Sequence, residues 1–414
     1  MFETTSKTVP VSKEMVKRAY RKVKSNRGTA GVDKESLEMF EADLLNNLYK
    51  LWNRMSSGSY FPKPVRAVSI PKADGKKRVL GIPAVSDRIA QQVVKDYLEP
   101  RLEAQFHENS YGYRPLKSAH DALAEVQINV RHYAWVVDMD IKSFFDEVDH
   151  GLLMKALERH VSESWVKMYI RRWLESPAQQ ADGTLIGKAG SGTPQGGVIS
   201  PLLANLFLHY VLDKWLTQKH PEVAFVRYAD DVIVHCHTEV EAKQVLEDIR
   251  TRLAECKLRL NEQKTKLVYC QNYQRKQRKD YVKKFDFLGF TFKPQSVPSK
   301  RPGGGQFLGY GCSISQKAQT RIIGSWKELN WHRRKMTIQD IANEVNPQIR
   351  GIIRYYGKFR LTELKWLMQN FGFRLANWVL KKYKRFRGSY KEAYRWIADL
   401  KRSYPALFYH WTMM

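Results

Sequence analysis

Apolar residues flank the tetrapeptide Tyr228-Ala229-Asp230-Asp231 on both sides, and many of them are β-branched or aromatic. Runs of this kind predict two short strands, and the tetrapeptide between them predicts the tight turn that joins them. The predicted hairpin carries two adjacent carboxylates at its tip, which repel each other unless a cation lies beside them. Mg²⁺ is the natural candidate because it takes hard oxygen ligands and leaves room for substrate phosphates. The competing interpretation is plain turn chemistry, since Asp favours turns.

A second apolar strand is predicted over residues 135–141, before a helix that begins near Val148. Its period of two places Asp138 and Asp140 on one face. A carboxylate at the end of a buried strand is costly unless something compensates its charge, and a metal ion would do so. Structural acids also occur at strand ends, so both interpretations stay open.

The remaining pattern predicts a mixed α and β chain. Helices are expected over residues 12–56, 87–106, 151–176, 202–216 and 239–256, and a β-hairpin with an Asp-Gly turn over residues 65–83. Four cations lie near the tip of this hairpin, and they indicate either a solvated turn or a flap that clamps a triphosphate: Lys72, Lys76, Lys77 and Arg78.

The C-terminal part of the chain changes in composition. Residues 293–312 are rich in Pro, Gly and Lys, which favours a linker or a long loop. Residues 315–402 predict several helices that are dense in aromatic and basic side chains. Our preferred interpretation is a helical domain with one basic face that binds a nucleic-acid duplex, although aromatics at helical spacing are usually core.

Two loops carry further candidate chemistry. Residues 190–201 form a glycine-rich approach to a helix, which favours anions but fits neither the P-loop nor the dinucleotide-binding fingerprint. The segment Ser110–Pro115 holds two tyrosines and Arg114. Such a set can stack on a nucleotide, or it can equally well brace the fold.

Composition points to a polyanionic partner. The chain has 414 residues and a net charge of +28, from 70 Lys and Arg against 42 Asp and Glu. RNA or DNA is the first choice for such a chain, and a membrane surface is the competitor. No apolar run is long enough to span a membrane, and the N-terminus lacks a signal peptide. The four scattered cysteines form no CxxC pair, which fits a reducing cytoplasm.

Taken in order, these blocks resemble the bacterial group II intron-encoded reverse transcriptases, the maturases. The resemblance runs nearly end to end, and it depends on the whole series rather than on any one motif. The series comprises Ile70-Pro71-Lys72, Leu80-Gly81-Ile82-Pro83, Ser110–Pro115, Asp140-Ile141-Lys142, Pro194-Gln195-Gly196-Gly197, Tyr228–Asp231, Leu260-Asn261 with Lys264-Thr265, Phe287-Leu288-Gly289-Phe290 and Arg350–Gly357.

The resemblance implies an α+β right-hand polymerase, with fingers and an antiparallel palm sheet followed by a helical thumb or maturase domain. We expect a helical N-terminal extension over 1–56, fingers and palm over 57–292, the linker over 293–312 and the thumb over 313–414. It further implies an RNA-directed DNA polymerase that also binds its intron RNA to assist splicing and mobility. The expected partners are template and intron RNA, a DNA primer or target, and dNTPs, with no membrane.

Carried over by motif, Asp140, Asp230 and Asp231 are the expected catalytic carboxylates. The resemblance implies that they hold two Mg²⁺ ions about 4 Å apart, with Mn²⁺ as an alternative ion, for an in-line nucleotidyl transfer. The expected dNTP contacts are Lys72, Arg78, Phe145 as the gate against a 2′-hydroxyl, and Gln195. Lys264 matches the basic residue proposed to protonate the pyrophosphate leaving group. The expected nucleic-acid contacts are Arg114, Arg333, Arg334 and Arg354.

Other functions remain open at this point. One alternative is an RNA-binding splicing cofactor with a vestigial active site, although all three acids are present. Another is a host-adopted reverse transcriptase that works in defence or DNA repair. The chain stops at Met414, without the paired cysteines of an HNH endonuclease domain, so we expect no target cleavage by this chain.

Overall fold

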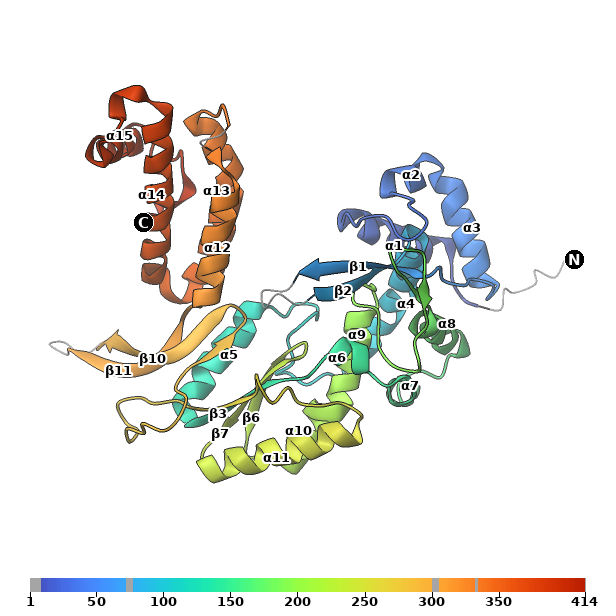
Figure 1. The fold of residues 1–414 in the computed structure, drawn as a ribbon. Coiled ribbons are helices and arrows are strands. Elements are labelled where there is room, and N and C mark those ends of the chain that lie inside the picture. The colour runs from blue at the N-terminus through green and yellow to red at the C-terminus, as the bar shows by residue number, and fades with distance from the viewer. Residues whose placement is uncertain (1–8, 72–76, 300–304, 332–333, 414) are drawn as a thin grey trace, which may run out of the picture. The chain divides into compact units, whose positions relative to one another are not determined.

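The computed structural model describes residues 9–71, 77–299, 305–331 and 334–413. The chain divides into two compact units. The first comprises Met1–Glu125 and Val137–Lys266, and the second comprises Val126–Val136 and Leu267–Met414. In the first unit, groups of helices are interspersed with short strands, whereas four long helices follow a small sheet in the second (Figure 1).

The first unit begins with three helices: α1 (Lys13–Ser25), α2 (Leu37–Ala42) and α3 (Leu44–Ser56). Ser12 caps α1 by accepting a hydrogen bond from the backbone N–H of Met15. The apolar face of α1 packs on α4 (Val85–Glu103), whose first half is buried on nearly every side. This packing explains why α4 lacks a clear amphipathic pattern.

The predicted hairpin over 65–83 is confirmed by β1 (Val65–Pro71) and β2 (Lys77–Ile82), which pair antiparallel with Ala67 opposite Gly81. Their sheet has the order β2-β1-β4-β5, and β1 runs parallel to β4 (Ala178–Gln179), which pairs with β5 (Leu185–Ile186). The tip of the hairpin, with Lys72 and Lys76, lies outside the described residues.

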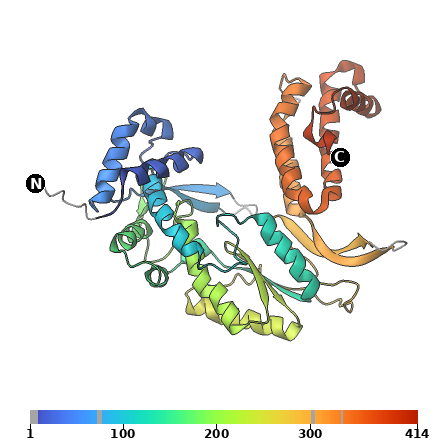
Figure 2. The same cartoon turned by 180° about the vertical axis from the view of Figure 1, so that it is seen from behind.

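A second sheet has the order β6-β7-β3-β8 and carries the acidic motifs. Its strands are β3 (Trp135–Asp140), β6 (Ala224–Tyr228), β7 (Asp231–Cys236) and β8 (Lys266–Tyr269). Helix α11 (Glu239–Glu255) contacts β7, and both views show it lying along this sheet (Figures 1 and 2). Its first turn is fixed by a capping box between Thr238 and Glu241.

The other helices of the first unit surround these sheets. Helix α9 (Ser200–Leu208) is buried along nearly its whole length and contacts α4 and α7. It continues through a π-helical turn, His209–Asp213, into α10 (Lys214–Lys219). The remaining helices are α6 (Phe144–Glu147), α7 (His150–Glu158) and α8 (Ser164–Glu175), and α5 (Ala119–His132) begins in this unit and ends in the second.

The second unit contains a three-stranded sheet in the order β11-β10-β9. Strand β10 (Phe290–Pro298) pairs with β11 (Gln306–Ile314) from Phe290↔Ile314 to Pro298↔Gln306, and β9 (Phe285–Phe287) covers only the first part of β10. The predicted linker or long loop over 293–312 is therefore wrong. Pro294 is tolerated because β10 has a single partner strand beyond Phe292.

Four helices complete the second unit: α12 (Gln316–Glu328), α13 (Ile338–Arg360), α14 (Leu364–Lys382) and α15 (Tyr390–Ser403). Helix α14 packs against each of the other three, so its buried side supplies the centre of this helical core. None of the helices in the described part of the chain is long and apolar enough to cross a membrane.

Candidate active site

The tetrapeptide Tyr228–Asp231 forms the tip of the hairpin that the sequence predicts. Strands β6 and β7 pair antiparallel, with Tyr228 opposite Asp231, so Ala229 and Asp230 are the two turn residues. Ala229 takes a positive φ of 58°, as the first turn residue of a tight hairpin requires. Val226 and Ile233, two residue pairs below Tyr228 and Asp231, are almost fully buried, and each contributes roughly 1.5–3 kcal/mol to anchoring the hairpin.

The segment that follows α4 supports this turn from one side. Residues Asn109 to Gly112 lie alongside β6, because Arg227 N–H donates to the Asn109 carbonyl at 2.9 Å and Tyr111 N–H donates to the Arg227 carbonyl at 2.8 Å. A Cβ on Gly112 would come within 2.4 Å of the backbone nitrogen of Ala229. A glycine is thus needed where this segment meets the turn.

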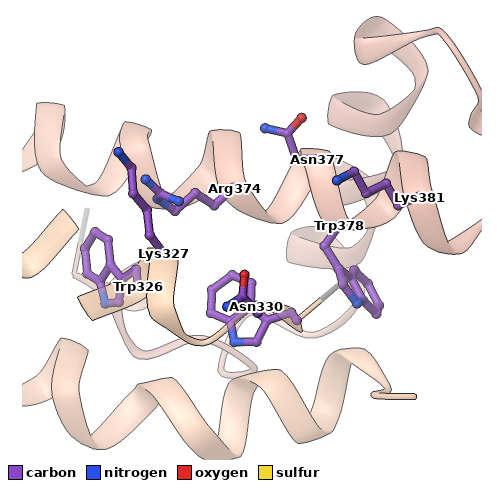
Figure 3. Close-up of a pocket in the computed structure, with 8 residues that line it drawn as sticks. Trp326, Lys327, Asn330, Arg374, Asn377, Trp378 and Lys381 are labelled. Carbon is purple, nitrogen blue, oxygen red and sulfur yellow. The ribbon is translucent and has the colours of Figure 1, made fainter. Parts of the chain in front are cut away.

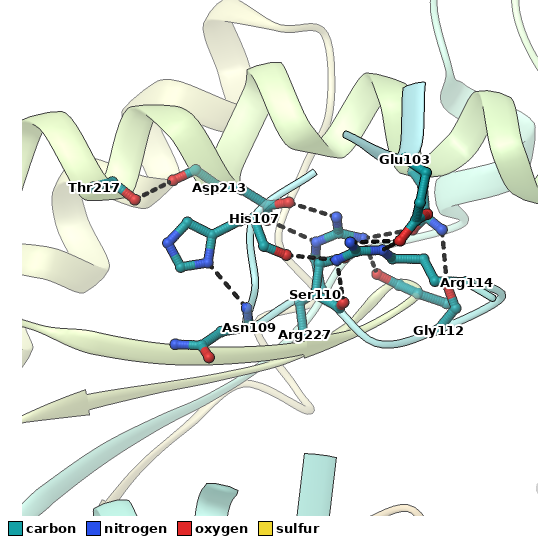
Figure 4. A network of polar contacts seen from close by, with 11 residues as sticks. Glu103, His107, Asn109, Ser110, Gly112, Arg114, Asp213, Thr217 and Arg227 are labelled. Carbon is teal, nitrogen blue, oxygen red and sulfur yellow. Dashed lines mark hydrogen bonds and ion pairs between the residues drawn. The ribbon is translucent and has the colours of Figure 1, made fainter. Parts of the chain in front are cut away.

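Arg227 is fully buried beneath the tip and makes a bidentate ion pair with the equally buried Asp213 (Figure 4). The guanidinium donates from Nε to Asp213 Oδ1 at 2.7 Å and from Nη2 to Oδ2 at 2.5 Å. Its Nη1 donates to Asn205 Oδ1 at 2.9 Å and to the carbonyl of Ala229 at 3.0 Å. The same Asn205 donates to the Gly112 carbonyl at 2.7 Å, so one network joins the turn, α9 and the supporting segment.

Asp140 lies at the end of β3, in a polar setting made by the segment that follows α11. Asn261 Nδ2 donates to Asp140 Oδ2 at 2.9 Å, and Lys264 Nζ lies 3.3 Å from Oδ1. Asn261 N–H also donates to the Asp140 carbonyl at 2.8 Å, which ties the two segments together. The exposed Lys264 ammonium is therefore held directly beside this carboxylate.

The three aspartates influence one another electrostatically. Burial raises the pKa of Asp230, and the charge of Asp140 raises it further. Burial together with the charges of Asp230 and Asp140 raises the pKa of Asp231 to about 6, against the opposing effect of Lys264. This concentration of negative charge favours a bound cation.

The described residues contain no group of three or more His, Cys, Asp or Glu side chains arranged as a ready-made metal cage. Mg²⁺ does not need one, because it is usually held by one or two carboxylates with waters and substrate phosphates completing its shell. Carboxylate oxygens at an exposed hairpin tip fit that requirement, and we regard the donor set as suitable for Mg²⁺.

Arg78 and Gln195 come together although they are far apart in sequence. Arg78 Nε donates to Gln195 Oε1, and Gly81 N–H donates to the Gln195 carbonyl at 2.8 Å, so the glycine-rich loop lies against β2. Gly196 has a φ of +125°, and a Cβ there would come within 2.7 Å of the Gly81 carbonyl oxygen. The positive charge of Arg78 also lowers the pKa of Asp230, against the larger effect of burial.

Two aromatic residues are connected with this region. Phe145 accepts a hydrogen bond at its carbonyl from Thr193 N–H at 2.7 Å, so the same glycine-rich loop holds its backbone. Tyr113 has a positive φ of 58° and an exposed side chain. Because the side chain is still partly buried, the pKa of Tyr113 is raised, and the charge of Asp230 raises it further.

Arg114 has a structural role, and its prediction as a nucleic-acid contact is wrong. Its side chain is only 6% exposed and pairs with Glu103 at 2.7 Å. Nη1 also donates to the carbonyls of His107 and Ser110, at 2.6 Å each. With its donors used in this way, Arg114 braces the supporting segment, as the alternative interpretation had it.

The other predicted basic contacts lie in the second unit or outside the described residues. Lys72 and Arg333 fall on residues that the structure does not describe. Arg334 is half exposed and pairs with Glu344 at 2.8 Å, and Arg354 is exposed on α13. The RNA contacts of these two arginines stay a prediction.

The sequence pattern assigned no functional role to four residues that hold the hairpin turn in place in the structure. They are Arg227, Asp213, Asn205 and Gly112. One signal was present: an arginine within an otherwise apolar strand must find a buried partner. Nothing in the spacing identifies Asp213 as that partner, because the π-helical turn that carries it has no sequence signature.

The sequence matches two known protein families. The sequence matches the reverse transcriptase (RNA-dependent DNA polymerase) family over residues 70–292, and the group II intron, maturase-specific domain over residues 320–396. Protein YkfC of Escherichia coli (strain K12) is 36% identical over 295 residues, which cover 62% of this chain and 77% of that protein.

Two further proteins are similar to this chain. The group II intron-encoded protein LtrA of Lactococcus lactis subsp. cremoris is 36% identical over 203 residues, 48% of this chain but only 33% of that protein. A solved structure of telomerase from Candida albicans, in complex with the TWJ fragment of telomeric RNA, has a TM-score of 0.46 and 14% identity. It covers 92% of this chain and 69% of that one, a likeness too weak to argue from.

Proposed function

Because the chain belongs to the reverse transcriptase (RNA-dependent DNA polymerase) family, we propose that it extends a primer 3′-hydroxyl with dNTPs on an RNA template, and that Asp140, Asp230 and Asp231 form its catalytic centre. The observation that carries this proposal is the sheet order: β3, which ends at Asp140, is hydrogen-bonded beside β7, which begins at Asp231. In agreement with this placement, the charge of Asp140 adds to burial in raising the pKa of Asp230 and of Asp231. Such a concentration of charge at an open hairpin tip is costly in the free protein, and it is useful when a cation and a polyphosphate bind there.

The residues around the tip have separable roles in this proposal. Mg²⁺ held by the three carboxylates would neutralise the charge that develops on the entering and leaving oxygens. Arg78, oriented by Gln195, offers its remaining guanidinium donors to a triphosphate. Lys264, beside Asp140, carries an ammonium proton close to where a pyrophosphate would leave.

We further propose that the second unit binds intron RNA and thereby assists splicing. The match to the maturase-specific domain over residues 320–396 supports this role, as does the excess of basic residues in the chain. The candidate contacts on this domain include Arg334 and Arg354, with Arg333 outside the described residues.

The direct test is primer extension on an RNA template with all four dNTPs. We expect incorporation with Mg²⁺ and none after chelation with EDTA, restored when excess Mg²⁺ is added back. Mn²⁺ should also restore it, because it accepts the same oxygen ligands. Incorporation that persists in EDTA would contradict a metal-dependent centre at the three aspartates.

A second prediction concerns sugar selection. Replacing Phe145 by alanine should let rNTPs be incorporated, because the ring proposed to lie beneath C2′ would no longer meet a 2′-hydroxyl. We expect the ratio of dNTP to rNTP kcat/KM to fall on the order of tenfold or more. Phe145→Tyr keeps the ring and serves as the matched control. Unchanged discrimination in the alanine variant would remove Phe145 from the gate.

A further inference from the structure

Exposed aromatic side chains lie along one face of α14 and the start of α15. Trp366 and Phe373 are 50% and 49% exposed, and their spacing of seven residues puts them on the same side of α14. Tyr390 and Tyr394 are each 43% exposed and lie about one helical turn apart on α15. Large exposed aromatics in this number are unusual for a helical surface that only faces water.

The two helices present their aromatics together. The rings of Phe373 and Tyr390 are stacked, with centroids 5.6 Å apart and an interplanar angle of 5°. The hydroxyl of Tyr390 donates to Asn377 Oδ1 at 2.6 Å, which fixes the ring on the surface of α14. The two rings, which we call the platform, are therefore already stacked on each other, while their side chains stay 49% and 43% exposed.

A cationic cavity adjoins this platform through Asn377. It has a volume of about 320 Å³ between α12 and α14, and its polar lining comprises Lys327, Asn330, Arg374, Asn377 and Lys381 (Figure 3). Trp326, Trp331 and Trp378 form its apolar wall. Asn377 thus contributes to the cavity and also holds the ring of Tyr390.

Three cations line this cavity: Lys327, Arg374 and Lys381. No ion pair is recorded for Lys327, Arg374 or Lys381 within the part of the chain that the structure describes, and burial lowers the pKa of Arg374. The surrounding stretch of residues 364–402 carries eleven Lys and Arg against two acids. Such a surface attracts a polyanion.

The combination of aromatics and cations discriminates between forms of RNA. In a duplex the base faces are stacked on one another, so a protein reaches mainly phosphates and 2′-hydroxyls. An unpaired strand exposes base faces, which stack on aromatic side chains while its phosphates meet cations. A duplex offers no exposed base faces along its length that could stack on such a platform.

We propose that Trp366, Phe373, Tyr390 and Tyr394, together with the adjoining cavity, bind an unpaired segment of RNA. In this arrangement bases stack on the Phe373–Tyr390 platform, and a neighbouring phosphate enters the cavity beside Lys327, Arg374 and Lys381. The inference deepens the RNA-binding role proposed above, and it replaces the expected duplex-binding face with a track for single strands.

The test uses the full chain and a fluorescein-labelled 12-nucleotide oligouridylate, with affinity measured by fluorescence anisotropy. Unlabelled primer–template at saturating concentration occupies any polymerase cleft, so that the remaining signal reports a second site. We expect the double variant Phe373→Leu with Tyr390→Leu to bind the oligouridylate about 5- to 150-fold more weakly, because base stacking on the platform is lost. Leucine keeps apolar contact area and removes only the flat ring.

Matched variants separate stacking from other effects. Tyr390→Phe keeps the ring and should retain affinity close to that of the parent chain. Tyr49→Leu removes another exposed tyrosine, from α3 in the first unit, and should leave affinity unchanged. Lys381→Glu is a surface change at the cavity, so it should weaken oligouridylate binding even if the double variant does not fold.

Three outcomes would overturn the proposal. One is unchanged oligouridylate affinity in the double variant and in Lys381→Glu. Another is an equal loss of affinity for a 12-base-pair RNA duplex, which would indicate a purely electrostatic surface. The third is unchanged RNA binding with a shift in oligomeric state, which would make the platform a protein interface. Because the measurement requires no nucleotide incorporation, its result is independent of whether the chain polymerises DNA.

Discussion

Replacing Asp230 by alanine is expected to abolish dNTP incorporation on a primed RNA template while leaving RNA affinity largely intact. Asp230 is half-buried in the turn of the β6–β7 hairpin, where its charge raises the pKa of Asp231. Removing this carboxylate takes away part of the proposed Mg²⁺ ligand set and should lower kcat by at least about 10³-fold. RNA affinity should persist, because it depends on basic surfaces elsewhere in the chain.

A surface acid supplies the control for this variant. Asp182 lies in the turn between β4 and β5, is exposed, and accepts a hydrogen bond from the N–H of Thr184 in its own loop. Asp182→Ala should therefore extend primers at the rate of the parent chain. If Asp230→Ala lost RNA binding and incorporation to the same degree, the aspartates would be structural and the catalytic assignment would be refuted.

Hydrophobic periodicity was sufficient to predict the local elements around this site. Alternation and β-branched residues predicted the β6–β7 and β1–β2 hairpins, and both pair as expected. The same method failed over residues 293–312, because Pro, Gly and Lys obscured a real strand pairing. Composition reflects only the intrinsic secondary-structure preference of a segment. Strand β10 is stabilised by pairing with β11, which composition does not reveal.

The supports of the tip could not be predicted in the same way, because they are long-range contacts. Asp213 reaches Arg227 from a π-helical turn, and Asn205 joins the network from the preceding helix. Neither residue has a distinctive spacing relative to the motif. For Arg114 the sequence suggested a functional contact where the structure has a structural one. Its side chain is buried and forms an ion pair with Glu103.

Removing the charge of Arg227 is expected to destabilise the fold strongly. Arg227→Met would leave the fully buried Asp213 without its partner and would free the carbonyl of Ala229 at the turn. Breaking a buried ion pair from one side typically costs about 3–5 kcal/mol. We therefore expect the free energy of unfolding, measured by urea denaturation, to fall by about that amount, with a lower urea midpoint.

The double variant Arg227→Met with Asp213→Leu distinguishes the buried charge from simple loss of packing. With both charges gone, no uncompensated ion remains, so the double variant should recover much of the stability that Arg227→Met loses. It should nevertheless extend primers poorly, because the bonds from Arg227 to Asn205 and to the turn carbonyl of Ala229 are still missing. Recovered stability with full primer extension would mean that this network stabilises the fold without positioning the catalytic tip. A double variant no more stable than Arg227→Met would mean that shape, rather than charge, makes Arg227 necessary.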